Sequence, residues 1–151
     1  MRSPVNALLR YWHSVLGLPR QLPSWHRDRL REELLERRMT KTSWRKLSET
    51  SDVFFCISRA RYDGSYTRNL PPITPRHTLI YVYMVIKYTS RWELYRTTAR
   101  LCRVPHFDQV CEVVNPGKDH KLAEVALRHD IDVAHFSRVC RRLQRVWPLL
   151  P

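Results

Sequence analysis

The stretch WRKLSETSDVFFCISRARY, residues 44–62, decides how the N-terminal part of the chain folds. Its run from Val53 to Ile57 is apolar on every side of a helix, and such a helix is typical of a protein interior. The pair Asp63-Gly64 directly after it predicts the end of the helix. We therefore expect residues 44–62 to be the most enclosed element of the fold.

Two further helices are predicted before this element. Apolar residues recur at helical spacing over residues 4–16, and Gly17 with Pro19 ends that helix. The second, WHRDRLREELLERRM at residues 25–39, has a narrow apolar edge and charges on its other faces. Short connections make sequential helices antiparallel neighbours. We predict an all-α fold in which residues 1–63 form an antiparallel three-helix unit.

The rest of the chain predicts a linker followed by a helical extension. Residues 64–77 contain one glycine and three prolines and are typical of a linker. Residues 78–151 are the extension, with a helix expected over 75–103. Residues 121–144, KLAEVALRHDIDVAHFSRVCRRLQ, have the pattern of a helix-turn-helix hairpin. In that pattern Ala126 takes the small position where the helices cross, and Asp130 stands where glycine is usual.

Charge is the strongest global signal. The chain has 27 Lys and Arg against 14 Asp and Glu, a net charge of +13. The positive electrostatic field of such a charge favours an acidic partner, whether nucleic acid, anionic lipid or an acidic protein. The last predicted helix carries one basic stripe, formed by Arg138, Arg141, Arg142 and Arg145. This stripe is suited to a phosphate backbone in DNA, RNA or a mitochondrial ribosome, or to another subunit.

Other classes of protein are not expected. Three glycines are too few for a phosphate-cradling loop, and the chain contains neither G-x-S-x-G nor His-Glu-x-x-His, so we predict no enzyme. The four cysteines form no Cys-x-x-Cys, so we predict neither a disulfide scaffold nor a metal site. The apolar run LIYVYMVI, residues 79–86, is far short of the ~20 residues that a transmembrane helix needs.

The tripeptide Leu94-Tyr95-Arg96 lies in the stretch RWELYRTTARL, residues 91–101. It spells the motif after which one family of small mitochondrial proteins is named. After it, however, the chain has only a short stretch to Pro105 and no second Arg-rich helix. We therefore expect this copy to be a buried Leu and Tyr beside a solvent-facing Arg.

The N-terminal part of the chain matches the family layout better. NALLRYWHSVLGLP (6–19), WHRDRLREELLERR (25–38) and DVFFCISRARYDG (52–64) together resemble the LYR-motif, or complex I LYR, superfamily. Leu8-Leu9-Arg10 takes the motif position, with Leu9 in place of tyrosine. Leu35 and Arg37 lie near the family's Phe-Arg pair, with Leu35 in place of phenylalanine.

The resemblance implies a non-enzymatic adaptor or assembly factor in the mitochondrial matrix. It implies binding of mitochondrial acyl carrier protein, an acidic partner, with no cofactor except the partner's acyl-phosphopantetheine, and a respiratory or ribosomal client bound through the extension. An acid-poor, Arg-bearing start before Asp28 is also typical of a mitochondrial presequence. The implied partner-binding residues are Leu8, Leu9, Arg10, Leu35, Arg37, Arg38 and Lys41. The alternatives are a nucleic-acid- or ribosome-binding protein that acts through the C-terminal stripe, and a structural subunit without a ligand.

Overall fold

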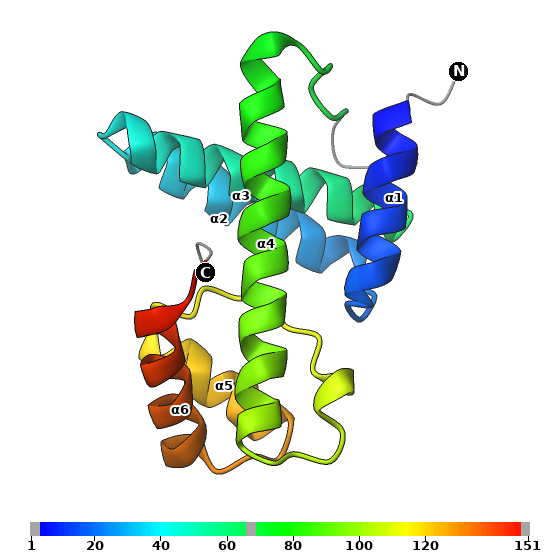
Figure 1. Cartoon of the computed structure of the whole chain (residues 1–151). Helices are drawn as coiled ribbons and strands as arrows, with labels where there is room; N and C mark the ends of the chain where they lie inside the picture. Colours follow the sequence, from blue (N-terminus) through cyan, green and yellow to red (C-terminus); the bar gives the residue numbers. More distant parts are fainter. Residues whose placement is uncertain (1–3, 66–68, 149–151) are drawn as a thin grey trace. The chain divides into compact units, whose positions relative to one another are not determined.

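The computed structural model describes residues 4–65 and 69–148, and its regular elements there are all helices (Figure 1). The prediction of an all-α fold is therefore confirmed. The helices are α1 (Pro4–Leu16), α2 (Pro23–Met39), α3 (Ser43–Tyr62), α4 (Pro75–Leu101), α5 (Asp119–Arg128) and α6 (Val133–Val146), with a 3-10 turn η1 (Phe107–Gln109) between α4 and α5.

The chain forms two compact units, Met1–Val85 and Ile86–Pro151. The division lies inside α4, later in the chain than the proline-rich stretch 64–77. The reason is that the first turns of α4 pack within the first unit. The rings of Tyr81 and Phe54 are 5.0 Å apart, and those of Tyr83 and Trp44 are 5.5 Å apart.

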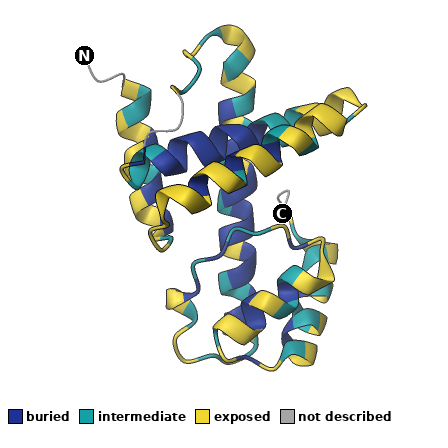
Figure 2. Ribbon diagram, turned by 180° about the vertical axis from the view of Figure 1, so that it is seen from behind, coloured by how far each residue is buried: buried dark blue, intermediate teal, exposed yellow. Residues whose placement is uncertain are grey.

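In the first unit, α3 is the helix against which the others pack. Both α2 and α1 contact it, α2 along its length and α1 across its C-terminal half (Figure 1). Every residue from Val53 to Ile57 is buried, as the sequence predicted, and the C-terminal half of α3 is the buried centre of this unit (Figure 2). Val53, Cys56 and Ile57 form one apolar cluster with Leu30 of α2.

A buried carboxylate at the end of α3 holds the connection between α1 and α2. Asp63 Oδ2 lies 3.0 Å from His26 Nε2 and accepts a hydrogen bond of 3.1 Å from the backbone N–H of Gln21. Its Oδ1 lies 3.2 Å from Arg59 Nη2, which also donates to the carbonyls of Leu18 and Pro19. The three ionisable side chains of this network are at most 3% exposed. This shielded network therefore joins the α1–α2 connection, the first turn of α2 and the C-terminal end of α3.

A second buried polar contact joins α1 to α3. His13 Nε2 lies 2.9 Å from Ser58 Oγ, and the Ser58 hydroxyl donates to the carbonyl of Phe55. The hydroxyl proton is therefore committed, so His13 Nε2 is the donor in this pair. Burial, aided by the positive charge of Arg59, lowers the pKa of His13 to about 3. His13 is neutral in the folded protein at physiological pH.

The second unit is built from the C-terminal half of α4 with α5 and α6. Its core includes Leu94, Tyr95, Leu122, Phe136 and Cys140, each inaccessible to solvent. Tyr95 stacks on Phe136 with 6.3 Å between ring centroids.

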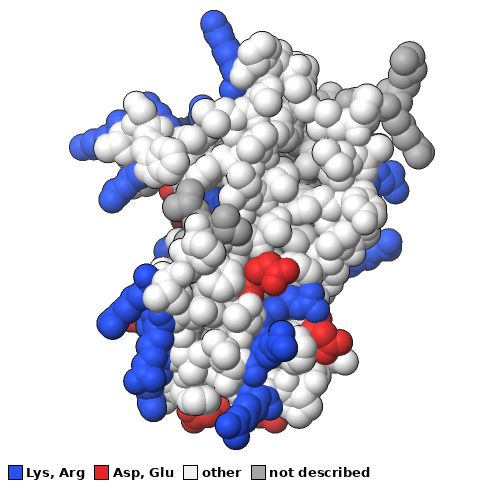
Figure 3. Space-filling view, in the orientation of Figure 1, with Lys and Arg blue, Asp and Glu red and all other residues white. Residues whose placement is uncertain are grey.

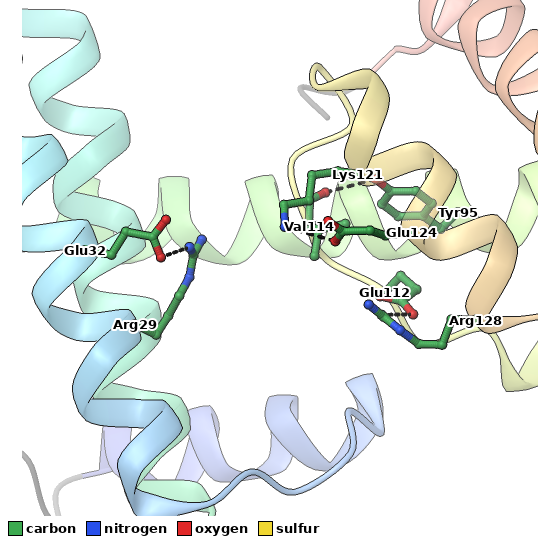
Figure 4. A network of polar contacts seen from close by, with 8 residues as sticks. All are labelled: Arg29, Glu32, Tyr95, Glu112, Val114, Lys121, Glu124 and Arg128. Atoms are coloured by element: carbon green, nitrogen blue, oxygen red, sulfur yellow. Dashed lines mark hydrogen bonds and ion pairs between the residues drawn. The ribbon is translucent and has the colours of Figure 1, made fainter.

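Polar contacts hold the segment between η1 and α5 in the second unit. The Tyr95 hydroxyl donates to the Val114 carbonyl over 3.2 Å (Figure 4). The buried carboxylate of Glu112 accepts from Arg128 Nη1 over 2.5 Å, and His129 Nε2 lies 3.0 Å from the same oxygen. The segment is therefore tied both to α4 and to the C-terminal end of α5.

The Leu94-Tyr95-Arg96 tripeptide is part of this core. Leu94 and Tyr95 are completely buried, as predicted. Arg96 is not freely solvent-facing, since its guanidinium lies 4.4 Å from the Trp92 ring centroid and donates to the Asp108 carbonyl over 2.8 Å. That expectation was wrong because the connection after α4 folds back over the side chain.

The hairpin of α5 and α6 has the predicted features of a helix-turn-helix. Ala126 is fully buried, and the turn after α5 places Asp130 in the left-handed conformation with a φ of 55°. The Ile131 N–H then donates to the Ala126 carbonyl, which completes the helix C-terminus. Asp132 caps α6 by accepting from the His135 N–H over 2.7 Å.

Replacing Asp63 by asparagine is expected to lower the free energy of unfolding by about 3 kcal/mol, because one partner of a buried ion pair is removed and the other is left uncompensated. Urea denaturation followed by circular dichroism measures this change. Asp28→Asn is the matched control, since the Asp28 side chain is 76% exposed. A loss no larger than that of the control would contradict a structural role for the network.

Replacing His13 by glutamine is expected to flatten the loss of stability in acid. The folded-state pKa of His13, about 3, lies below its ordinary value of 6.5. The unfolded chain therefore takes up the proton first. The stability that His13 contributes is complete above about pH 6.5 and is lost as the pH falls towards 3, by up to about 1.4 kcal/mol per pH unit.

Urea denaturation at several pH values between about 4 and 7.5 tests this expectation. Burial raises the pKa of Glu33 to about 7 despite Arg29 beside it, so Glu33 gives the opposite pH dependence. The comparison of His13→Gln with the unsubstituted chain cancels that contribution. His106→Gln, at an exposed position, is the control. Equal slopes for His13→Gln and the unsubstituted chain would show that His13 is not the group responsible.

Candidate functional site

Three arginines form an exposed row along α6. Arg138, Arg142 and Arg145 are each exposed, and their spacing of four and three residues puts them on one face of the helix. Among the residues that the structure describes, none of the three side chains has a hydrogen bond or ion pair. We call them the α6 row, and Figure 3 shows basic side chains gathered along this helix.

The opposite face of α6 fixes the direction of this row. Phe136 and Cys140 are fully buried, and Leu143 and Trp147 pack against the same core. Trp147 Nε1 also donates to Ser90 Oγ over 2.8 Å, which ties the end of α6 to α4. Because one face of the helix is held in the core, the α6 row is held towards solvent.

Arg141 lies apart from the α6 row. Its guanidinium donates to the carbonyl of Pro116 and to Gln144 Oε1, each over 2.9 Å, and forms an ion pair with Asp119. Within the described part of the chain, the predicted stripe of four arginines thus divides into three cations without a partner and one that joins α6 to the start of α5.

The residues implied by the family resemblance fall into two groups in the first unit. On α1, the side chain of Leu9 is buried, whereas that of Leu8 is exposed. Arg10 is exposed and lines a cavity of about 520 Å³ whose wall includes Asn6, Ser58 and Arg61.

The second group lies at the other end of α3. Leu35 is exposed, and Arg37 Nε donates to Thr50 Oγ1 over 2.9 Å. Arg38 and Lys41 are exposed at the C-terminal end of α2 and just after it. Lys41 lines a second cavity, of about 590 Å³, together with Glu36 and Glu49.

The structure does not bring these two groups together. Arg10 lies beside Arg61 at the C-terminal end of α3, and Arg37 contacts Thr50 in its N-terminal half. The two positions on α3 are separated along the helix axis by roughly 16 Å, at about 1.5 Å per residue. A partner that uses both groups must therefore span α3.

Aromatic side chains pack between α1 and α3 next to the cavity beside Arg10. The ring of Phe55 is 6.0 Å from that of Trp12 and 5.6 Å from that of His13, and His13 is 5.4 Å from Tyr62. An acyl chain that extended from this cavity into the aromatic cluster would have to displace these rings.

Three carboxylates from α2 and α3 gather near the second cavity. Oxygens of Glu33, Glu36 and Glu49 lie within 4.8 Å of one another. Glu33 is nevertheless paired with Arg29 Nη2 at 2.5 Å, and its raised pKa means that it is half protonated near neutral pH. Arg29 therefore already supplies this acidic cluster with a counter-ion. The four cysteines are free thiols.

Comparisons with known proteins add no relative. The chain matches no protein-family model, no curated protein sequence and no solved structure. The resemblance to the LYR-motif superfamily therefore rests on the quoted residues alone. Over residues 4–65 and 69–148, no helix combines the length and hydrophobicity needed to cross a membrane.

Sequence reasoning did not find Asn6 and Arg61, which share a cavity wall with Arg10. Arg61 stands in the last turn of α3, where a basic residue is common for helix stability alone. Arg61 lines the cavity beside Arg10 because α1 crosses α3 at this point. No local feature of the sequence predicts that crossing.

Proposed function

We propose that the chain binds nucleic acid by contacting the phosphate backbone with the α6 row. The observation that carries the proposal is a set of three exposed arginines, unpaired among the residues that the structure describes, on a helix whose opposite face is held in the core. Arginine forms two parallel hydrogen bonds to a phosphate group, and the bound guanidinium stays charged at every physiological pH. The net charge of +13 adds long-range attraction for a polyanion.

The surroundings of the row favour backbone contact over the reading of bases. The exposed residues in the first turn of α6 include Ala134 and His135, which offer few groups for base edges. Asp130 and Asp132 at the start of α6 would repel phosphate. The contact is therefore expected towards the C-terminal half of the helix, where Arg142 and Arg145 lie.

RNA of the mitochondrial ribosome is one source of such a backbone, and the matrix is the compartment that the acid-poor start of the chain suggests. Phosphate contacts carry little sequence information, so binding is expected to depend on salt more than on sequence.

The double substitution Arg142→Glu with Arg145→Glu is expected to weaken binding of a labelled 20-nucleotide RNA at least thirtyfold, because each reversal replaces attraction to phosphate by repulsion. Fluorescence anisotropy at about 100 mM salt measures the affinity. With the unsubstituted chain, three phosphate contacts predict a slope of about −2 to −3 for the logarithm of the binding constant against the logarithm of salt concentration.

The control has the same change of charge in the first unit, namely Arg37→Glu with Arg38→Glu. It is expected to weaken binding much less, since only the general field of the protein changes. If both double variants lose the same affinity, binding is a property of net charge and the assignment to α6 fails.

A second candidate function is that of an adaptor for acyl carrier protein, with a respiratory or ribosomal client. It is favoured by the cavity of about 520 Å³ in which Arg10 lies beside Arg61. Two guanidinium groups there suit a phosphate or the carboxylates of an acidic helix. The basic group at Arg37, Arg38 and Lys41 would contact a second part of the same partner.

Arg10→Glu is expected to weaken binding of purified acylated acyl carrier protein at least tenfold, since it places a like charge against an acidic partner. Isothermal titration calorimetry measures this affinity. Arg142→Glu is the control and is expected to leave it unchanged. Absence of any heat of binding with the unsubstituted chain would remove the adaptor function.

A further inference from the structure

A second set of free cations lies at the end of α4. Arg100, in the last turn of the helix, and Arg103, just after it, are both exposed. Arg100 lies over the ring of Phe107 at 5.7 Å from its centroid. Within residues 4–65 and 69–148, the Arg103 side chain makes no hydrogen bond or ion pair. Figure 3 shows basic side chains at this end of the second unit as well as along α6, with uncharged surface between them.

The backbone of Arg103 is unusual for an arginine. Its φ is 59°, in the left-handed region that favours glycine. There it ends α4, with its N–H donating to the Arg100 carbonyl and the Val104 N–H donating to the Ala99 carbonyl. The other non-glycine residue with positive φ in the described chain is Asp130, a residue type that tolerates this conformation. An arginine kept where glycine is preferred points to a function for its side chain.

The aromatic residues of the second unit are turned inward. From Ile86 to Pro148 they are Tyr88, Trp92, Tyr95, Phe107, Phe136 and Trp147, and each is buried or half-buried. Proteins that bind single-stranded nucleic acid stack its bases on exposed aromatic rings. The described surface of this unit offers cations without such rings, so it is suited to a nucleic acid whose bases are already paired.

We propose that the partner is a double-stranded nucleic acid, and that Arg100 and Arg103 contact one of its backbones while the α6 row contacts the other. This inference rests on the proposed nucleic-acid binding through α6. The helices α4 and α6 are neighbours, as the Tyr95–Phe136 stack and the Trp147–Ser90 hydrogen bond show. These two contacts also show that the helices run antiparallel, so Arg138 is at the end of the α6 row closer to Arg100 and Arg103. A duplex has two backbones bordering one groove and therefore offers phosphates to both sets of arginines.

The test uses the full chain with a 20-base-pair RNA duplex, a DNA duplex of the same sequence and their separated strands. Fluorescence anisotropy is expected to show at least one duplex bound tenfold or more tightly than its own strands. Arg103→Gly is expected to weaken binding to that duplex about threefold to tenfold and to lower the salt slope by about 1, with little effect on single strands.

The glycine variant is chosen because it should not damage the fold. Glycine adopts the left-handed conformation without strain, so the melting temperature is expected to stay equal or to rise. Arg103→Lys keeps a cation and is expected to retain most of the affinity. Arg27→Gln, at an exposed position on α2, removes the same charge elsewhere and is expected to change little.

The outcomes separate this inference from the function on which it rests. If the unsubstituted chain binds nucleic acid and Arg142→Glu weakens binding, but Arg103→Gly leaves the duplex affinity unchanged, the second contact is wrong and the first stands. Equal affinity for the duplex and its strands would overturn the double-stranded partner. If no probe binds, both proposals fall together.

Discussion

The stacking of Tyr95 on Phe136 fixes which face of α6 meets solvent. When Phe136 is buried, the residues on the same face of α6 enter the core with it. These are Cys140 one turn later, Leu143 two turns later and Trp147 at the end of the helix. Everything on the outer face is then determined by helical geometry, including the direction of Arg138, Arg142 and Arg145. The same stack also places α6 beside α4, so the cations at the end of α4 depend on it as well.

The charges of this protein divide into those that hold the fold and those that remain free. Asp63 and Arg59 form an ion pair beside His26 out of reach of solvent, and Arg141 is used in the contact between α6 and α5. These groups are unsuited to binding a partner because each is already paired within the fold. The net charge alone therefore does not locate the surface that binds a polyanion. Only the cations without a partner inside the protein indicate that surface.

Local patterns were enough to predict α1, the enclosed run from Val53 to Ile57 and the hairpin of α5 and α6. These features depend on residues close together in sequence. The helix over residues 75–103 was predicted because the sequence offers no second strand with which it could pair. The separation of Arg10 from Arg37 could not be predicted, because it results from the way α1 crosses α3. Nor could the pairing of Arg141 with Asp119, since both residues look equally free in a sequence. Arg103 was overlooked because its distinguishing property is a backbone angle.

The division of the chain inside α4 has a consequence for synthesis on the ribosome. Phe54 of α3 is covered by His77 and Tyr81, which are made after the rest of its unit. A ribosome that adds about 5–20 residues per second needs on the order of one to five seconds to extend the nascent chain from Tyr62 to Val85. Throughout that interval one apolar side of α3 has no covering helix. The N-terminal unit can therefore complete its core only after residues up to Val85 have left the exit tunnel.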